Sequence, residues 1–427
     1  MRKIFTLILL LPVIASFGQG EKSVTIDSCY VWAKQNYPLL KQYNVIEQTK
    51  SFTVQNAWRN YIPQLNVSGQ ATYQSETTNF ADVFGSLPPQ FAGLMKFPNY
   101  NKDQYRITAE VYQTIFDAEA GKFRKENALA EAEVKKQNLE VNLYTLRDRV
   151  NQVYFGILLI DEELKQNDLV QKDIQNVVDK TQAFVDNGTA FKSSVDELKA
   201  QLLQTRQNRI ELTSSRKSYL LVLGLFIGRP LDEGAALATP STPVLTPDIK
   251  RSELQLYQLQ KKSIDIQTRQ LETGFMPQIN AWFDGSYGRP TLNSVSNDFG
   301  AFWITGIRFN WTLSALYTFK NNKRILNLNQ NDLDIQKETF LFNTNVNLTQ
   351  QNENIKKYSD LVAKDKEIVD LRTSVKNASN AQLQNGVLTA HDYLTQVDAE
   401  AQARLGLILH QVQLLQAEYN YQTTSGN

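Results

Sequence analysis

The chain has 427 residues, more than one ordinary compact core contains unless the fold is elongated or repeated. Its 45 Lys and Arg nearly balance its 44 Asp and Glu, so no basic surface argues for a nucleic-acid partner. The only cysteine, Cys29, excludes an intrachain disulfide, and with the two histidines of the chain it cannot form a Cys/His zinc cluster.

The sequence contains no recognisable arrangement of catalytic residues. No serine or cysteine nucleophile is placed relative to His391 or His410 in a recognisable nucleophile–base motif. No phosphate loop of the GxGxxG or GxxxxGKS/T type occurs either. We therefore predict that the protein is not an enzyme and uses no cofactor or metal.

The N-terminal segment has the layout of a signal peptide. Arg2 and Lys3 give it a positive start, and the apolar run Ile4–Ile14 follows. The run is too short to span a bilayer, and the small residues before Gln19 suit cleavage at that point. We predict that residues 1–18 direct export and are then removed.

Beyond this segment the sequence repeats itself. An aromatic residue, one further residue and Pro-Gln occur near the start of two stretches, NYIPQLNVSGQATYQ from Asn60 and GFMPQINAWFDGSYG from Gly274. A helical pattern precedes each stretch, and a second alternating stretch follows it, at Tyr105 and at Phe302. Two long helical tracts interrupted by Asn-Gly complete each copy. Because the elements recur in one order, the sequence predicts an internally duplicated fold.

Alternation of apolar and polar residues predicts two strands in each copy. The four predicted strands cover residues 64–75, 105–116, 278–288 and 302–313. Pro63 and Pro277 mark the points where a helix ends and a strand begins. The first strand has a polar face made of Asn66, Ser68, Gln70 and Thr72. Alternating segments of about ten residues are typical of outer-membrane barrels.

The number of strands predicts an oligomer. No stretch after the signal peptide is apolar for long enough to be a membrane helix, so strands would have to cross the membrane. Four strands cannot close a barrel with an open interior, and an open sheet leaves two unpaired edges. Three chains would together supply a 12-stranded transmembrane β-barrel.

The helical tracts carry heptad patterns typical of coiled coils. In the first copy, apolar residues step by four and three along one seam: Leu139, Leu143, Leu146, Val150, Val153, Ile157, Ile160 and Leu164. In the second copy, an apolar residue recurs at every seventh position: Leu341, Leu348, Ile355, Val362 and Val369.

Each pair of tracts is expected to bend at Asn-Gly, because glycine accepts a left-handed conformation at a helix end. Ser193, Ser194 and Thr389 can begin the returning helices. We predict long helical hairpins with tips near 187–190 and 385–388.

These elements give a complete domain plan. It comprises a signal peptide 1–18, a first repeat 19–228, a linker 229–249 rich in Pro, Ala and Thr, a second repeat 250–422 and a polar tail 423–427. The outer loop of the first repeat is the longer one and includes Leu87-Pro88-Pro89. The sequence offers no functional explanation for its extra length.

With these motifs in order, the sequence resembles the TolC-like outer-membrane efflux channel family. Asn36-Tyr37-Pro38-Leu39 is similar to the NP-x-L element of that family's first helix. YIPQL (61–65) and FMPQI (275–279) are similar to its two strand openings. NGTAFKSSVDEL (187–198) and NGVLTAHDYLTQVDAE (385–400) resemble its paired hairpin tips. The resemblance covers almost all of the chain after the signal peptide.

The resemblance implies a homotrimer that forms an outer-membrane barrel and an α-helical periplasmic tunnel. Such a channel is a passive duct of a tripartite multidrug efflux pump or a type I secretion system, carrying solutes, drugs or polypeptides. Its partners would be a periplasmic adaptor, an inner-membrane pump of the RND, ABC or MFS type and the lipid of the outer membrane of a diderm bacterium. Adaptor docking is expected at the hairpin tips: Asn187, Gly188, Thr189, Ala190, Asn385, Gly386, Val387 and Leu388.

The periplasmic gate is where this sequence departs from the family. Members commonly carry an acidic ring a few turns before the second tip, whereas residues 371–390 contain no Asp or Glu. We expect instead an amide-lined constriction at Asn377, Asn380 or Gln384. A solvated outer helix face is the alternative interpretation of these three residues.

Two other classes of protein share part of these features. A periplasmic adaptor or structural coiled-coil protein would have the helical hairpins, but an adaptor has one hairpin flanked by small β domains. A stand-alone diffusion porin needs many more strands per chain and leaves the long helices unexplained. Two hairpins and four amphipathic strands favour the duct.

Overall fold

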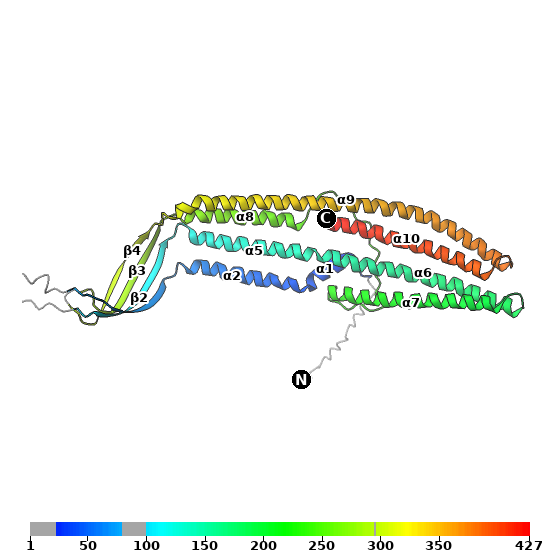
Figure 1. Ribbon diagram of the computed structural model, residues 1–427, viewed down its shortest axis with the longest axis horizontal. Helices are drawn as coiled ribbons and strands as arrows, with labels where there is room; N and C mark the ends of the chain where they lie inside the picture. The colour runs from blue at the N-terminus through cyan, green and yellow to red at the C-terminus, as the bar shows by residue number, and fades with distance from the viewer. Residues whose placement is uncertain (1–22, 79–99, 294–295) are drawn as a thin grey trace, which may run out of the picture. The chain divides into compact units, whose positions relative to one another are not determined.

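The computed structural model describes residues 23–78, 100–293 and 296–427. The predicted signal peptide and Leu87-Pro88-Pro89 lie outside these residues. The elements, in chain order, are α1 (Ile26–Asn36), the 3-10 turn η1 (Pro38–Lys41), α2 (Gln42–Arg59), β1 (Gln64–Tyr73), β2 (Asp103–Phe116), α5 (Ala120–Tyr144), α6 (Leu146–Asp186), α7 (Lys192–Ile227), α8 (Ser252–Thr273), β3 (Gln278–Arg289), β4 (Gly300–Asn310), α9 (Ala315–Gln384) and α10 (Ala390–Ser425) (Figure 1). Within the described ranges, no helix is both long and apolar enough to cross a membrane.

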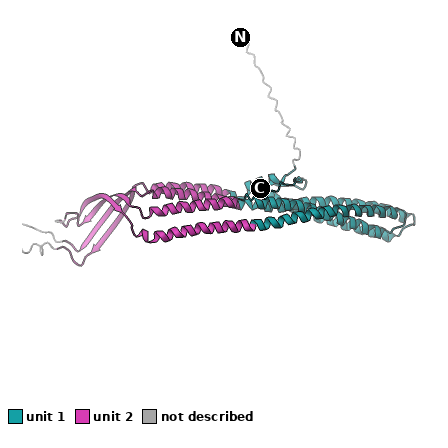
Figure 2. Cartoon of the chain, turned by 90° about the horizontal axis from the view of Figure 1, so that it is seen from above, with its two compact units in different colours: residues 1–40, 142–251, 344–427 teal, residues 41–141, 252–343 magenta. Residues whose placement is uncertain are grey.

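The chain divides into two compact units (Figure 2). The helical unit consists of residues 1–40, 142–251 and 344–427, and the strand unit of residues 41–141 and 252–343. Each unit therefore takes segments from both sequence repeats. Equivalent segments of the two predicted repeats lie in the same unit. The compact units therefore do not coincide with the two sequence repeats.

The strand unit contains one antiparallel sheet in the order β1-β2-β3-β4. Its register places apolar residues opposite apolar residues: Leu65 faces Val111, and Val111 in turn faces Phe283. Ile107 and Tyr287 form a further pair of this kind. Because side chains alternate between the two faces of a sheet, these pairs share one continuous apolar face. The prediction of a mainly helical chain with four strands is confirmed.

Several strand boundaries differ from the expected ones. β1 ends at Tyr73 rather than residue 75, β2 begins two residues early at Asp103, and β3 continues to Arg289. The largest change is in the last strand. It was expected at 302–313 but occupies Gly300–Asn310, because Trp311 and the two residues after it turn toward α9.

The helical unit is built around α6. Helix α7 runs back antiparallel along it, and α10 and α1 pack against it as well (Figure 1). Its larger core cluster includes Tyr154, Phe155 and Ile157 of α6 with Leu220 and Leu223 of α7. The heptad seam is largely buried, as expected for a coiled coil. Its buried members are Leu139 and Leu143 on α5, of which Leu139 belongs to the strand unit, and Leu146, Val150, Ile157 and Ile160 on α6.

Cys29 lies in the same core, fully buried on α1. Burial raises the pKa of its thiol to about 12, because a thiolate would lose its hydration there. The thiol therefore stays protonated and unreactive, as expected for a structural cysteine.

The predicted linker is fixed to the helical unit. Val24 and Leu237 form a parallel bridge, with Val24 N donating to Ala236 O at 2.9 Å. The Tyr154 hydroxyl donates to the carbonyl oxygens of Val24 and Ala238, which holds both segments against α6. The segment joins the two repeats in sequence and also helps to cover the core.

The C-terminal residues are not a free tail. We expected residues 423–427 to be a polar tail, but α10 continues to Ser425 and only then ends at Gly426. Thr423 and Ser425 are buried, and Lys250 N donates to Ser425 O at 2.7 Å. The prediction was wrong because the residues are polar but find hydrogen-bond partners inside the fold.

Candidate functional site

Both hairpin tips in the helical unit have the same backbone geometry. At the first tip, Gly188 N donates to Val185 O at 2.9 Å and Thr189 N donates to Phe184 O at 2.8 Å. These two bonds form a Schellman motif, which satisfies the last carbonyls of α6. The motif requires a left-handed residue, and Gly188 supplies it with a φ of +74°.

The second tip repeats this arrangement at the end of α9. Gly386 N donates to Leu383 O at 3.1 Å, and Val387 N donates to Gln382 O at 2.9 Å. Gly386 has a φ of +71°. At both tips the asparagine side chain donates to the carbonyl oxygen one turn back, from Asn385 to Ala381 and from Asn187 to Ala183. Asn-Gly therefore ends both helices by one mechanism.

The two returning helices begin differently. The hydroxyl of Thr389 accepts from Asp392 N at 3.2 Å and donates to the Asp392 carboxylate at 2.6 Å, so α10 has a side-chain cap. Helix α7 begins at Lys192 after Phe191, without a side-chain cap. Its start was expected at Ser193 or Ser194, which lie inside the first turn.

The tip residues proposed for docking are not equally accessible. Val387 is 76% exposed, whereas Leu388 packs against a second core cluster, which includes Ile174 of α6, Leu198 of α7 and Val397 of α10. Ala190 is half-buried in the first tip. Sequence reasoning missed Phe191, which is 81% exposed and presents the largest apolar side chain of the first tip. An aromatic residue between a turn and a helix start was the available signal.

A charged contact connects the two hairpins just below the tips. His391 Nδ1 on α10 lies 2.7 Å from Glu197 Oε1 on α7. The hydrogen bond to this carboxylate raises the pKa of His391 above its ordinary value. Both side chains are largely exposed to solvent, so the contact can respond to the pH of the surroundings.

The three gate candidates lie on one side of α9. Gln384 Nε2 donates to Asn380 Oδ1 at 3.2 Å, and Asn377 lies about one turn earlier. Asn377 and Gln384 are exposed and Asn380 is half-buried. The structure thus brings these amides into one stripe that can hydrate a passage without selecting charge.

Lys376, the basic neighbour of this stripe, turns into the helical unit. Its Nζ lies 2.9 Å from Asp173 Oδ2 on α6 and 3.4 Å from Glu400 Oε2 on α10. Glu400 is 3% exposed and is also paired with Arg404. This ionic cluster joins α6, α9 and α10 a few turns from the tips, and no sequence pattern indicated it.

In the strand unit, the repeated aromatic-x-Pro-Gln motif fixes the two helix-to-strand junctions. At the first, α2 ends at Arg59, and Pro63 precedes β1. The Tyr61 hydroxyl lies 2.9 Å from the carboxylate oxygens of Asp117, which is buried where β2 turns into α5. This turn contains Ala118 and Glu119 at positive φ, so Tyr61 braces a backbone conformation that is unfavourable by itself.

The second junction uses the equivalent aromatic residue without a carboxylate. The ring of Phe275 meets that of Phe319 edge-on at 4.9 Å, at the start of α9. Trp311 Nε1 donates to Phe275 O at 2.8 Å, so the segment after β4 is held to the segment that follows α8. Pro277 again stands between helix and strand. Each copy of the motif therefore joins the start of one strand to the end of its partner.

The sheet exposes the apolar face described above. Its exposed side chains include Leu65, Val67, Ile107, Trp303, Ile307 and Phe309. Aromatic rings gather at the loop end of the sheet, where Phe299 stacks with Tyr105 and Tyr287. Phe309 and Trp311 pack edge-on at the opposite end. An apolar band between two aromatic belts is the surface that a bilayer covers.

Comparison with protein families gives a match over much of the first repeat. Residues 30–229 match the family described as outer membrane efflux protein. This match supports the family resemblance expected from the sequence. The resemblance predicted from the sequence is thus found again for the first repeat, as a match to an outer membrane efflux protein family.

Solved structures share the fold of this chain over most of its length. The open state of the MtrE outer membrane channel of Neisseria gonorrhoeae has a TM-score of 0.66 at 13% identity, covering 94% of this chain and 89% of that one. The outer membrane protein VceC of Vibrio cholerae gives 0.65 at 12% identity, covering 94% and 96%. The CmeC outer membrane channel of Campylobacter jejuni gives 0.63 at 11% identity, covering 94% and 85%.

At these identities the likeness establishes the fold of the chain and nothing finer. No curated protein sequence matches the chain. Among the described residues, no three His, Cys, Asp or Glu side chains are grouped so that they could hold a metal ion. The roles of the tips, the amide stripe and the junctions therefore rest on the geometry above.

Proposed function

We propose that the protein is the passive outer-membrane duct of a tripartite efflux pump or type I secretion system. The observation that carries the proposal is the sheet of the strand unit. It has a largely exposed apolar face, and among the described residues β1 and β4 each pair with one neighbour only. Such a sheet needs lipid on its face and further strands at both edges.

Three copies satisfy both needs. Strand β1 is antiparallel to β4, so the β4 edge of one copy can accept the β1 edge of the next without reversing the alternation. Two copies would give eight strands, which close around a filled interior, whereas three give twelve and leave a passage. The polar residues Asn66, Ser68, Gln70 and Thr72 would then face the lumen.

The helical unit would lie in the periplasm and carry the gate and the docking surface. The proposed constriction is the amide stripe of Asn377, Asn380 and Gln384. The proposed docking surface comprises the two tips, with Val387 and Phe191 as apolar contacts for a periplasmic adaptor. The pump behind the adaptor would be of the RND, ABC or MFS type, and the transported solute follows from that partner.

Disulfide scanning tests the trimer. The native Cys29 is buried, so cysteines placed at Ser68 on β1 and at each position 302–308 on β4 report strand pairing alone. We expect one or more pairs to give covalent trimers in outer-membrane fractions, visible on non-reducing gels and lost on reduction. Only monomers across the whole scan, or a chain found wholly in the soluble periplasm, would favour an adaptor or coiled-coil protein instead.

Crosslinking from the tips tests docking and names the partner. A photo-crosslinker at Val387 or Thr189 is expected to capture a periplasmic protein in cells, because both side chains are exposed. The matched control is the same crosslinker at Tyr317, which is exposed on α9 within the strand unit. Equal capture from both sites would contradict docking at the tips and leave the trimer unaffected.

A further inference from the structure

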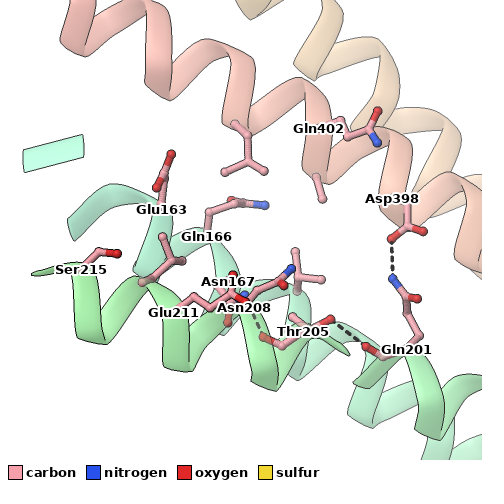
Figure 3. A pocket seen from close by; sticks show the side chains of 14 residues that line it. Glu163, Gln166, Asn167, Gln201, Thr205, Asn208, Glu211, Ser215, Asp398 and Gln402 are labelled. Atoms are coloured by element: carbon pink, nitrogen blue, oxygen red, sulfur yellow. Dashed lines mark hydrogen bonds between the residues drawn. The ribbon is translucent and has the colours of Figure 1, made fainter. Parts of the chain in front are cut away.

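The helical unit contains a polar cavity that the duct does not explain. Its volume is about 700 Å³, and it lies between α6, α7 and α10 (Figure 3). This volume is in the range of small-molecule sites. All of its lining residues come from one chain and from the helical unit.

The charge of the cavity is entirely negative. Three carboxylates line it, those of Glu163 on α6, Glu211 on α7 and Asp398 on α10, and no Lys, Arg or His is among its lining residues. None of the three has a cationic partner among the described residues. Arg209, the nearest base in sequence to Glu211, pairs with Asp168 outside the cavity.

Burial acts on two of these carboxylates. Desolvation raises the pKa of Glu163 and, despite a hydrogen bond from Gln201, that of Asp398. Carboxylates in this position gain from any cation that enters, because the cation restores the lost electrostatic stabilisation of the ionised form.

An independent observation points to a ligand. Gln166 is 6% exposed and lines the cavity, yet its amide has no hydrogen-bond partner in the described part of the chain. Figure 3 shows its side chain extending from α6 into the space below α10, while Asp398 reaches Gln201 across the same space. Polar side chains buried to this extent are normally hydrogen-bonded, so an unpaired one aimed into a cavity marks a place for a donor or acceptor.

The placement of the acids on separate helices indicates that a cation with separated charges fits the cavity better than a single metal ion. The carboxylates lie on three different helices and are not grouped to hold a metal ion. Apolar side chains of Val170, Leu212 and Leu405 line the same cavity. A ligand with separated ammonium groups and a flexible alkyl chain meets both features, since its charges reach the acids and its methylenes cover the apolar residues.

We propose that this cavity binds a small aliphatic di- or polyamine, with Glu163 and Asp398 holding its ammonium groups and Gln166 completing the site. The site is separate from the tips, the amide stripe and the lumen-facing strands. When the ligand is bound, it connects α10 to the α6–α7 hairpin. The proposal concerns binding by the folded chain and does not depend on the identity of the pump or cargo.

Calorimetry on the full-length protein purified in detergent tests this directly, with spermidine as the probe. We expect one binding event per chain that weakens with added salt, and at least a tenfold loss of affinity in the Glu163→Gln/Asp398→Asn variant. These replacements keep the shape of both side chains and remove charges that have no cationic partner, so the variant should fold. A melting curve of the variant, compared with the wild-type curve, checks this.

The matched control is Glu162→Gln, one residue away, where the acid pairs with Lys165 at 2.6 Å outside the cavity. It should bind spermidine as the wild type does. A neutral probe of similar length, 1,8-octanediol, should not bind. The proposal is overturned if spermidine gives no binding up to millimolar concentration, if the double variant binds like the wild type, or if Glu162→Gln loses as much affinity as the double variant.

Discussion

Glu197 of α7 and His391 of α10 meet at 2.7 Å and form a titratable link between the two hairpins below their tips. The link joins the α6–α7 hairpin to the α9–α10 hairpin within one protomer. Its strength depends on the charge of the imidazole, so the link responds to pH.

The first prediction concerns the pH dependence of this link. The carboxylate raises the pKa of His391 in the folded protein above its unfolded value of about 6.5. A raised folded pKa means that the stabilisation is complete below the unfolded pKa and is lost as pH rises through the folded pKa. In NMR titrations, His391 should titrate above about pH 6.5, and Glu197→Gln should lower its midpoint.

His391→Asn identifies the resonance, because the chain has two histidines. An unchanged midpoint in Glu197→Gln would mean that the pair does not exist in solution. The negative charge of Asp392 also raises the pKa of His391, but by less than Glu197 does. Asp392→Asn should therefore lower the titration midpoint of His391 by less than Glu197→Gln does.

The second prediction concerns the tip glycines. Gly188→Ala or Gly386→Ala should destabilise the helical unit by about 1–2 kcal/mol, because the left-handed region costs an L-residue that much. A Cβ would meet no atom within 4 Å at either site, so the loss is conformational and not steric. Gly188→Asn should cost less, since Asn tolerates this conformation. Thermal melts followed by circular dichroism measure the differences.

Gly406 provides the control for this series. It lies inside α10 without a positive φ, and a Cβ added there would also meet no atom within 4 Å. Gly406→Ala should therefore stabilise the protein by up to about 1 kcal/mol, through better helix propensity. A loss of stability there equal to that at the tips would contradict the assigned cause.

The third prediction concerns the buried ionic cluster. Lys376→Met leaves Glu400 buried with Arg404 as its remaining base, and the expected loss is about 3 kcal/mol, at the lower end for a broken buried pair. Adding Glu400→Gln should restore part of that loss, because the uncompensated charge is removed. Chemical unfolding of the single and double variants measures the coupling.

The exposed pair Lys356–Glu353 on the same helix gives the comparison. Lys356→Met should change stability by less than about 1 kcal/mol, as surface pairs contribute little. If the two lysine variants lose the same amount, the cluster does not hold the three helices together.

The fourth prediction concerns the first helix-to-strand junction. Tyr61→Phe removes the hydroxyl that bonds to buried Asp117, and we expect a loss of about 1–3 kcal/mol because the carboxylate loses a partner. Hydrogen exchange should rise at the turn of Ala118 and Glu119. Tyr317→Phe, at an exposed tyrosine, should leave stability and exchange unchanged.

The fifth prediction concerns the proposed gate. Asn380→Ala should raise passive conductance in planar bilayers several-fold, because a smaller side chain widens the constriction and frees Gln384. Gln382→Ala, on the opposite side of α9, is the control and should conduct as the wild type does. Unchanged conductance across Asn377, Asn380 and Gln384 variants would place the gate elsewhere.

The features that local physics controls could be predicted from the order of the amino acids. Period-two alternation located the strands, heptad spacing located the buried seam, and Asn-Gly located both helix ends, because each depends on residues near one another in the chain. The doubling of the motif at Tyr61 and Phe275 also set the topology, since a repeated order of elements gives a repeated structure. The polar composition of residues 423–427 led to the wrong prediction of a free tail.

Packing, by contrast, determines which distant side chains meet. Tyr61 bonds to Asp117, His391 to Glu197, and Lys376 to both Asp173 and Glu400, and none of these pairs has a sequence signature. Charged and amide residues on long helices look alike until the helices are packed. After packing, some of these side chains remain solvated, others form pairs, and a few are buried without a partner. Burial and proximity are properties of the fold, so the sequence alone does not show them.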